Sequence, residues 1–263
     1  MTSELDLDAY LARIGFAGRF EPTLAAFEEL HLAHNTHIPF ENLDILLGRP
    51  IRLDLASIQD KLIRAKRGGY CFEQNTLFAA VLEKLGLPAT FLAARVRFRA
   101  QRVLPRTHVF LLIEVDGMKW IADVGFGTVG LLKPIPLVAG PIAEQFGWAY
   151  RLVEEPDLWV LQTRQGNDWS DLYAFTLEPQ FPVDLELANY YISTHPDSRF
   201  VQALVVQRSL TTQRYLLRNL DLIVDRGGEA TSTTLRDQDE LLEVLAESFE
   251  LRFAVGTRFR IPS

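Results

Sequence analysis

Hydrophobic residues recur every three or four positions through the first third of the chain, which is the spacing of helices with one buried face. The clearest run places Phe78, Val81, Leu82 and Leu85 on one face of a helix that ends at Gly86. Four helices are predicted in this part, at residues 6–14, 23–33, 57–66 and 71–86. The first opens with an aspartate that can cap its first turn.

After residue 88 the pattern changes to alternation of polar and apolar residues, which predicts antiparallel strands. Two β-rich runs, 108–115 and 118–124, are joined by Asp116 and Gly117, a strong signal for a two-residue hairpin turn. Further strands are expected at 95–98, 148–163, 171–177, 203–206 and 215–224, then an amphipathic helix at 237–248 and a strand-like end at 252–261. The pattern therefore predicts a helical first third, a β middle and a mixed final part.

The hairpin turn fixes the register of its two strands, and the register decides which side chains meet. Glu114 then faces Lys119, an opposite-charge pair that supports this alignment. Because strand side chains alternate between faces, His108 and Asp123 lie on the same apolar face. They are diagonal neighbours about 7–8 Å apart at the backbone, a gap that their side chains can close. The sequence thus predicts a contact between this histidine and this aspartate.

The single cysteine of the chain, Cys71, is expected at the start of the fourth helix. Gly68 and Gly69 precede it and let the backbone turn sharply. The unpaired N–H groups and the dipole of a helix start favour a thiolate over a thiol. Most lone cysteines are small core residues, but a carboxylate-oriented histidine supplies the base that a nucleophile needs. Cys71, His108 and Asp123 are therefore predicted to form a catalytic triad.

Composition and charge narrow the class of protein. The chain has 263 residues, 48% of them hydrophobic and 23% charged, so it can bury a large core. The net charge of -7 disfavours nucleic acid as a partner, although a local basic patch can still receive a phosphorylated ligand. No apolar run reaches about 18 residues, and the N-terminus lacks the apolar stretch of a signal peptide, so no membrane contact is expected. One cysteine forms no intramolecular disulfide, and the expected location is the cytoplasm.

Two motifs suggest other chemistry and are set aside. Residues 125–130 match the glycine pattern of dinucleotide-binding loops, but two prolines follow where such a loop must open a helix. Those glycines are expected instead to let a loop pass close to the thiol. His31 and His34 share a helix face, but His37 falls off it, and no acidic or thiol ligand has matching spacing. Ordinary helix and cap histidines are therefore expected, and no metal site.

Four short segments carry a resemblance to a known family. They are Pro-Phe-Glu-Asn-Leu-Asp at 39–44, Arg-Gly-Gly-Tyr-Cys-Phe-Glu-Gln-Asn at 67–75, Thr-His at 107–108 and Asp-Val-Gly-Phe-Gly at 123–127. Together they resemble the arylamine N-acetyltransferases, and the order and spacing of the three predicted triad residues agree. The likeness covers nearly the whole chain in organisation, although in the last third it is a match of element order alone.

The resemblance implies an α+β fold with a helical bundle, an antiparallel β-barrel and an α/β lid. The triad would be arranged as in papain-like and transglutaminase-like thiol enzymes. Applied to this sequence, it predicts a helical domain at 1–86 that carries the cysteine, a β-barrel domain at 87–195 that carries the histidine and the aspartate, and a lid domain at 196–263.

The resemblance also implies a chemistry for the triad. Cys71 would attack the thioester of acetyl-CoA and become acetylated, His108 would hold the thiolate as an ion pair, and Asp123 would orient His108. An aromatic amine or hydrazine would then take the acetyl group, in a ping-pong mechanism. Acetyl-CoA is thus the implied co-substrate, and no metal cofactor is expected.

Other positions are assigned by the same resemblance. Phe126 resembles a residue that lines the acceptor pocket, while Thr107 and Phe200 resemble positions near the CoA arm. Arg67 and Glu41 are expected to form a structural pair. Two alternatives stay open, which are a thiol amidase or amide synthase on the same scaffold, and a binding module with an inert triad. The natural acceptor, the preferred acyl length and the oligomeric state are also open.

Overall fold

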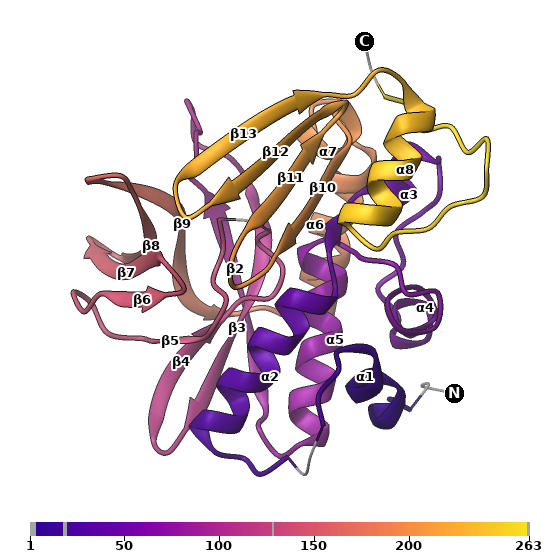
Figure 1. Ribbon diagram of the computed structural model, residues 1–263. Helices are drawn as coiled ribbons and strands as arrows, with labels where there is room; N and C mark the ends of the chain where they lie inside the picture. The colour runs from indigo at the N-terminus through magenta and orange to yellow at the C-terminus, as the bar shows by residue number, and fades with distance from the viewer. Residues whose placement is uncertain (1–3, 18–19, 128, 262–263) are drawn as a thin grey trace.

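The structure, a computed structural model, describes residues 4–17, 20–127 and 129–261. Helices of the N-terminal part pack beside a curved eight-stranded sheet, and a five-stranded sheet lies above both in the view of Figure 1. The chain is therefore α+β, as predicted. No helix in the described ranges is long and apolar enough to cross a membrane.

The larger sheet takes all its strands from the middle of the chain, whereas the smaller sheet combines one strand of the first part with four of the last. The helices are α1 (Leu7–Arg13), α2 (Leu24–His37), α3 (Leu43–Leu46), α4 (Leu55–Gln59), the π-helix η1 (Asp60–Arg64), α5 (Cys71–Lys84), α6 (Pro182–Thr194), α7 (Arg199–Gln202) and α8 (Gln238–Ser248). The larger sheet contains β2 (Ala89–Val96), β3 (Arg106–Val115), β4 (Met118–Ala122), β5 (Ile135–Pro136), β6 (Ala143–Gln145), β7 (Trp148–Glu155), β8 (Leu158–Gln165) and β9 (Asp168–Pro179). The smaller sheet contains β1 (Phe40–Glu41), β10 (Val205–Ser209), β11 (Arg214–Arg218), β12 (Asp221–Arg226) and β13 (Glu229–Thr234).

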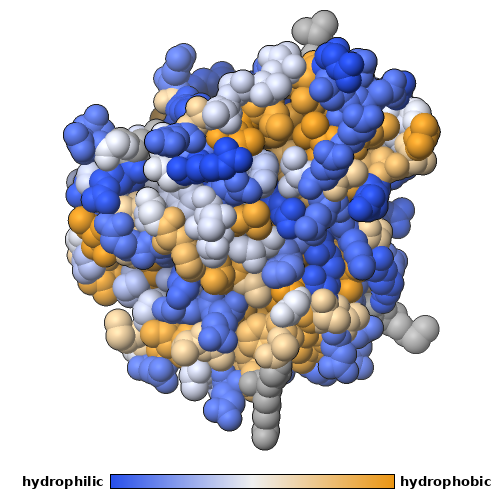
Figure 2. All heavy atoms as spheres, in the orientation of Figure 1, coloured by the Kyte–Doolittle hydropathy of each residue, from blue (hydrophilic) through white to orange (hydrophobic). Residues whose placement is uncertain are grey.

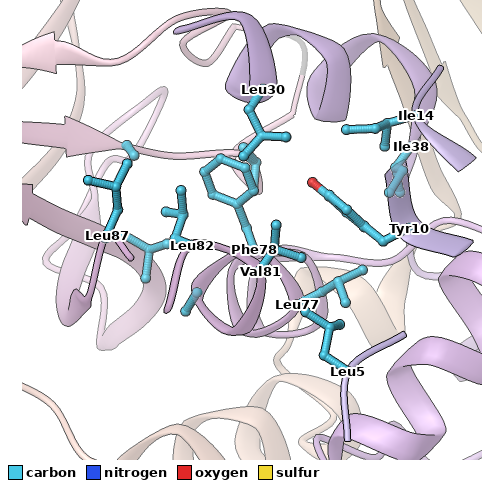
Figure 3. Close-up of a cluster of buried hydrophobic side chains, with 14 of the residues drawn as sticks. Leu5, Tyr10, Ile14, Leu30, Ile38, Leu77, Phe78, Val81, Leu82 and Leu87 are labelled. Carbon is cyan, nitrogen blue, oxygen red and sulfur yellow. The ribbon is translucent and has the colours of Figure 1, made fainter. Parts of the chain in front are cut away.

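A hydrophobic core joins the helices to the larger sheet. Phe78 of α5, Leu30 of α2 and Tyr10 of α1 are fully buried in one cluster, which Figure 3 shows from close by. The same cluster includes Leu111 on β3. Replacing a phenylalanine in such a position with alanine costs about 3–5 kcal/mol. This core seats α5 against β3, and Cys71 is the first residue of α5.

The four predicted helices are present, with two differences in extent. Thr23 caps α2 through its side chain, but α2 continues to His37 rather than ending at residue 33. The third helix begins earlier than predicted, at Leu55, because the Asp54 carboxylate accepts a hydrogen bond from the Ser57 N–H at 2.9 Å and caps it. It then passes into the π-helix η1.

The larger sheet is antiparallel throughout and forms a nearly closed barrel, in the order β5-β4-β3-β2-β9-β8-β7-β6. Gln145 on β6 joins the two edges. Its Oε1 accepts hydrogen bonds from the N–H groups of Leu132 (2.9 Å) and Lys133 (3.0 Å), which lie just before β5. The predicted hairpin register is confirmed, since Glu114 pairs with Lys119 across β3 and β4.

The smaller sheet has the order β1-β10-β11-β12-β13 and lies next to α8 in Figure 1. Figure 2 shows hydrophobic side chains at the surface in this upper region, between stretches of hydrophilic ones. Strand β1 comes from the helical first part and pairs with β10, Phe40 opposite Gln207. Strand β1 thus ties the first predicted domain to the sheet of the third. The division at residues 1–86, 87–195 and 196–263 stays a prediction.

Two predictions for the last two-fifths of the chain are wrong, and one helix was missed. Residues 215–224 form a hairpin rather than one strand, because Asn219 turns the chain with φ at 54° between two equally β-rich runs. Residues 252–261 form no regular strand. Helix α6 was not predicted, because Val183, Leu187 and Tyr190 lie on its exposed face and mask the helical spacing of its buried side.

Candidate active site

Cys71 lies at the first turn of α5 and is 3% exposed. The two glycines before it are required by close packing. A Cβ on Gly68 would lie 2.1 Å from the Pro39 carbonyl oxygen, and one on Gly69 would lie 2.8 Å from a Glu73 carboxylate oxygen. That carboxylate accepts a hydrogen bond from the N–H of the residue before Cys71, at 3.1 Å. The thiol is therefore held at a helix start, where the dipole favours a thiolate.

A cluster of buried ion pairs lies beneath this turn. The Arg67 guanidinium contacts Glu41 at 2.6 Å and Asp44 at 3.3 Å, and the Lys61 ammonium contacts Asp44 at 3.0 Å and Glu73 at 2.7 Å. The predicted pair of Arg67 and Glu41 is thus confirmed. Each charge in the cluster has an opposite partner, so the cluster fixes the backbone that leads to the thiol without leaving a buried charge uncompensated.

The predicted contact between His108 and Asp123 is confirmed. His108 Nε2 and Asp123 Oδ2 lie 2.7 Å apart, and the two side chains are 4% and 1% exposed. Strand β4 ends at Ala122, so Asp123 reaches the histidine from the first position after the strand. The Gly125 N–H also donates to Asp123 Oδ1 at 3.0 Å.

The electrostatics of this pair oppose the effect of burial. Burial lowers the pKa of His108, but the Asp123 carboxylate and the side chain of Cys71 outweigh it and raise that pKa to about 10. Burial likewise raises the pKa of Asp123, while His108 and hydrogen-bond donors hold it below its ordinary value. At neutral pH the pair is therefore imidazolium and carboxylate. Since Nε2 binds Asp123, Nδ1 is the ring nitrogen left to exchange protons with the thiol.

Asn75, for which no role was predicted, joins α5 to β3 and to the loop that begins at Asp123. It lies four residues after Cys71, one turn along α5, and is fully buried. Its side-chain NH₂ donates to the Val109 carbonyl on β3 at 2.9 Å and to Asp123 Oδ1 at 3.4 Å. Its Oδ1 accepts from the Val124 N–H at 3.3 Å. The signal available in the sequence was the spacing, since an asparagine four residues after the cysteine lies one helical turn from the thiol.

His31 also contacts the site, from the helical core. Its Nε2 accepts a hydrogen bond from the Asp123 backbone N–H at 3.1 Å, and its Nδ1 donates to the Leu132 carbonyl at 3.0 Å. Burial lowers the pKa of His31 to about 4, so the ring is neutral. The prediction of an ordinary helix histidine placed it correctly on α2 and missed this contact. Among the described residues, no three His, Cys, Asp or Glu side chains form a group that could hold a metal ion.

The glycine-rich loop after Asp123 passes directly over the start of α5. A Cβ on Gly125 would lie 2.5 Å from the Cys71 Cα and 2.6 Å from the Asn75 side chain, so the approach requires glycine. No helix follows the loop, which excludes a dinucleotide-binding turn in the described part of it. Thr128 lies outside the described residues. The prediction that these glycines bring a loop close to the thiol is confirmed.

One cavity of about 1260 Å³ brings together all six predicted site residues except the buried carboxylate. Cys71, His108, Thr107, Phe126 and Phe200 line it. The Cys71 thiol points to the Thr107 carbonyl oxygen, 3.9 Å away. The ring of Phe126 stands edge-on to His108, with 5.0 Å between centroids. The cavity is large enough for an extended ligand that reaches the thiol.

Comparison with known proteins agrees with this geometry. A family model described as N-acetyltransferase matches residues 23–257. The arylamine N-acetyltransferase of Escherichia coli K12 is 41% identical over 248 residues, which cover 93% of this chain and 88% of that protein. The crystal structure of the Nocardia farcinica arylamine N-acetyltransferase is similar with a TM-score of 0.90 and 45% identity, covering 95% of this chain and 91% of that one.

A third relative was solved with a ligand. The Mycobacterium marinum arylamine N-acetyltransferase in complex with CoA is similar with a TM-score of 0.89 and 34% identity, covering 94% of this chain and 93% of that one. Identity and coverage at this level extend over the helical part, the barrel and the smaller sheet. The chain belongs to the arylamine N-acetyltransferase family and is an acyltransferase.

Proposed function

We propose that this enzyme moves an acetyl group from acetyl-CoA to the nitrogen of an arylamine or arylhydrazine through an acetyl-Cys71 intermediate. The observation that carries the proposal is the buried ion pair of His108 and Asp123 beside the single thiol, in one cavity of about 1260 Å³. The relative that was solved with CoA supports acetyl-CoA as the donor.

The first half-reaction acetylates the thiol. The Cys71 thiolate, paired with the imidazolium of His108, attacks the carbonyl carbon of the thioester. A new S–C bond forms, the bond from that carbon to the CoA sulfur breaks, and the departing CoA thiolate takes the proton from His108. Exchange of one thiolate for another is nearly balanced in energy, which suits cysteine better than serine in this role.

The second half-reaction releases the acetyl group. The amine nitrogen attacks the acyl carbon of acetyl-Cys71, and the neutral His108 accepts the proton that the nitrogen loses. The carbon–sulfur bond then breaks, and Cys71 leaves as a thiolate beside the restored imidazolium. Asp123 keeps the ring oriented in both steps and stabilises its charged form.

The lining residues are assigned roles that fit their positions. Phe126 packs against His108 and Tyr173, where it can contact the aromatic ring of the acceptor. Thr107 and Phe200 line the same cavity as the thiol and are proposed to contact the pantetheine arm of the donor. A thiolate nucleophile requires no metal, and it requires reducing conditions, so we place the enzyme in the cytoplasm.

The proposal is tested by the order of events. Enzyme mixed with acetyl-CoA without amine is expected to gain one acetyl group on the peptide that contains Cys71, as measured by mass spectrometry. Steady-state kinetics are expected to give parallel double-reciprocal lines. Rapid loss of the acetyl group without amine would indicate a hydrolase of the same fold. Intersecting lines together with an unmodified Cys71 would contradict the mechanism.

The Cys71→Ser variant is the matched control for this experiment. It is expected to fold with an unchanged melting temperature and to lose transfer down to background, because an alkoxide is far harder to form than a thiolate at neutral pH. Transfer at a substantial fraction of the wild-type rate would remove Cys71 from the nucleophile role.

A further inference from the structure

Arg214, the first residue of β11, carries a buried positive charge in the wall of the Cys71 cavity. Its side chain is 4% exposed, and it lines the same cavity as the thiol. The guanidinium lies over the Trp148 ring, with 3.8 Å from its central carbon to the ring centroid. One terminal nitrogen donates to the Tyr150 hydroxyl at 2.7 Å and to the Gly130 carbonyl at 3.4 Å.

This charge has no opposite partner among the residues that the structure describes. Asp225 faces Arg214 across β11 and β12, but its carboxylate accepts a hydrogen bond from the Gly228 N–H at 2.8 Å and forms no ion pair with the guanidinium. The Nε of Arg214 is buried without a hydrogen-bond partner. Arg67 is the contrasting case, since its buried guanidinium contacts two carboxylates. A buried, uncompensated cation is unfavourable in the free protein and becomes favourable when an anion binds beside it.

The position of Arg214 connects it to the loop that carries Phe126. The Tyr150 hydroxyl, which accepts from Arg214, donates to the Gly130 carbonyl at 2.6 Å. Gly130 in turn lies against Phe126, because a Cβ on Gly130 would be 2.9 Å from the Phe126 Cβ. The guanidinium is therefore anchored to the end of the same loop that packs against His108.

We propose that Arg214 forms an anion subsite of the Cys71 cavity, which binds a carboxylate or phosphate oxygen of a bound substrate. The inference rests on the acetyl transfer proposed above. The link to the Phe126 loop favours an acceptor whose aromatic ring carries a carboxylate. The same guanidinium chemistry also suits a phosphate of the donor.

The test uses Arg214→Gln, which removes the charge, and Arg214→Lys, which keeps it. Arg164→Gln is the matched control, because Arg164 lines the same cavity but is exposed and already paired with Glu144. All three variants are compared with wild type after their melting temperatures have been measured. In the acceptor arm, kcat/KM is measured for 4-aminobenzoate and for its neutral analogue 4-aminobenzamide.

In the donor arm, the rate of Cys71 acetylation is measured with acetyl-CoA and with 4-nitrophenyl acetate, which carries no phosphate. Arg214→Gln is expected to lower kcat/KM for 4-aminobenzoate by about 10- to 100-fold, the effect of one charge-assisted hydrogen bond. The rate with 4-aminobenzamide is expected to change less than about threefold on the same scale. Arg214→Lys is expected to recover part of the loss, and Arg164→Gln to behave like wild type.

The pattern of losses shows which substrate the subsite binds. A loss confined to 4-aminobenzoate assigns the subsite to the acceptor, and a loss with acetyl-CoA but not with 4-nitrophenyl acetate assigns it to the donor phosphates. Equal losses with all four compounds, or no loss with any, would overturn the proposal and leave Arg214 a structural residue. Turnover of 4-aminobenzamide by the wild-type enzyme tests the acetyl transfer itself and does not depend on Arg214.

If neither Arg214 variant folds, the wild-type enzyme still tests the subsite. Benzoate is then expected to inhibit competitively against 4-aminobenzamide where benzamide does not, or inorganic pyrophosphate to inhibit competitively against acetyl-CoA. Equal inhibition by benzoate and benzamide, together with no effect of pyrophosphate, would overturn the proposal.

Discussion

Asp123 lies between two buried histidines, and the regions on its two sides differ in charge. On the cavity side, His108 contacts the carboxylate and has a pKa raised to about 10. On the core side, His31 contacts the backbone N–H of the same residue and has a pKa lowered to about 4. Burial acts on both rings alike, so the difference comes from the partner. The carboxylate that is hydrogen-bonded to His108 keeps a proton on that ring. Burial prevails at His31, which contacts Asp123 only through its backbone N–H, and keeps its ring neutral.

The two sides therefore have different tasks. In the proposed mechanism the cavity side supplies a charged acid and base, and we infer that the core side fixes the backbone from which the carboxylate projects. Asn75 links the two, because it donates to the carboxylate and accepts from the next backbone N–H. Variants that remove the charge on the cavity side or the contact on the core side test this difference.

The largest effect is expected from Asp123→Asn, which removes the charge that distinguishes the two sides. His108 would then lie in a neutral, buried environment like that of His31, and its pKa would fall. The same change in a serine triad costs about 10⁴ in rate, and a comparable loss of kcat/KM is expected here. Asp116→Asn in the exposed hairpin turn is the control. Full activity in a folded Asp123→Asn variant would contradict the role assigned to the pair.

The core side is expected to appear in the pH dependence of stability. The pKa of His31 is depressed to about 4 in the folded protein, so its stabilising contribution is present above its unfolded pKa near 6.5 and is lost as pH falls toward 4. Between pH 7 and pH 5 this histidine alone costs the fold about 2 kcal/mol. Urea unfolding of wild type and His31→Gln at the two pH values measures the difference. An identical loss in both proteins would rule out this contribution of His31.

The cavity side is expected to behave in the opposite direction. The pKa of His108 is raised to about 10. The stability that its ion pair contributes is therefore fully present below the unfolded pKa of about 6.5 and is lost progressively as the pH rises to about 10. Unfolding measured from pH 7 to pH 10 in wild type and in Asp123→Asn would detect it. The variant is expected to lose less stability over this interval.

A smaller effect on rate is expected when the core-side contact alone is removed. His31→Leu leaves the Asp123 N–H without its acceptor and lets the carboxylate shift. We therefore expect kcat to fall about 10-fold, which is within the free-energy cost of leaving one buried donor unsatisfied. His31→Gln offers a new acceptor and is expected to recover part of the activity. His37→Leu, at an exposed position of the same helix, is the control. If His31→Leu lowers the melting temperature but changes neither kcat nor its pH profile, His31 has a purely structural role.

The smallest effect concerns selectivity among acceptors. Phe126 packs edge-on to His108, whose hydrogen bond to Asp123 does not depend on it. Phe126→Ala is therefore expected to leave the rate of Cys71 acetylation nearly unchanged. Relative kcat/KM values among arylamines of different ring size are expected to change by about 10-fold, the effect of one ring contact in a pocket. Equal losses for acetylation and for every acceptor would make the residue structural.

The site was predictable where its parts are close in the chain. A two-residue turn set the pairing of β3 with β4, and that pairing brought His108 to Asp123. The thiol was predictable because glycines and a helix start mark its position. The contact between His31 and Asp123 was not, because it joins residues 92 positions apart and depends on how α2 packs against the barrel.

The same distinction applies to the fold. Local patterns found the helices capped by Thr23 and Asp237, whose side chains accept hydrogen bonds in the first turn. They missed α6, where apolar residues face solvent as well as the core, and they merged β11 with β12 across Asn219. In both places the outcome depends on which face of the segment is buried, and this is set by the rest of the fold rather than by the segment itself.

A thiol at a helix start and a histidine paired with an aspartate follow from local sequence, because turns, caps and strand alternation act over a few residues. The partners of each buried charge depend on the tertiary structure. Both Arg67 and Arg214 are buried, yet Arg67 contacts two carboxylates and Arg214 lines a cavity. The reason is that a charge interacts strongly only with what lies within a few ångströms of it, and folding alone sets those neighbours.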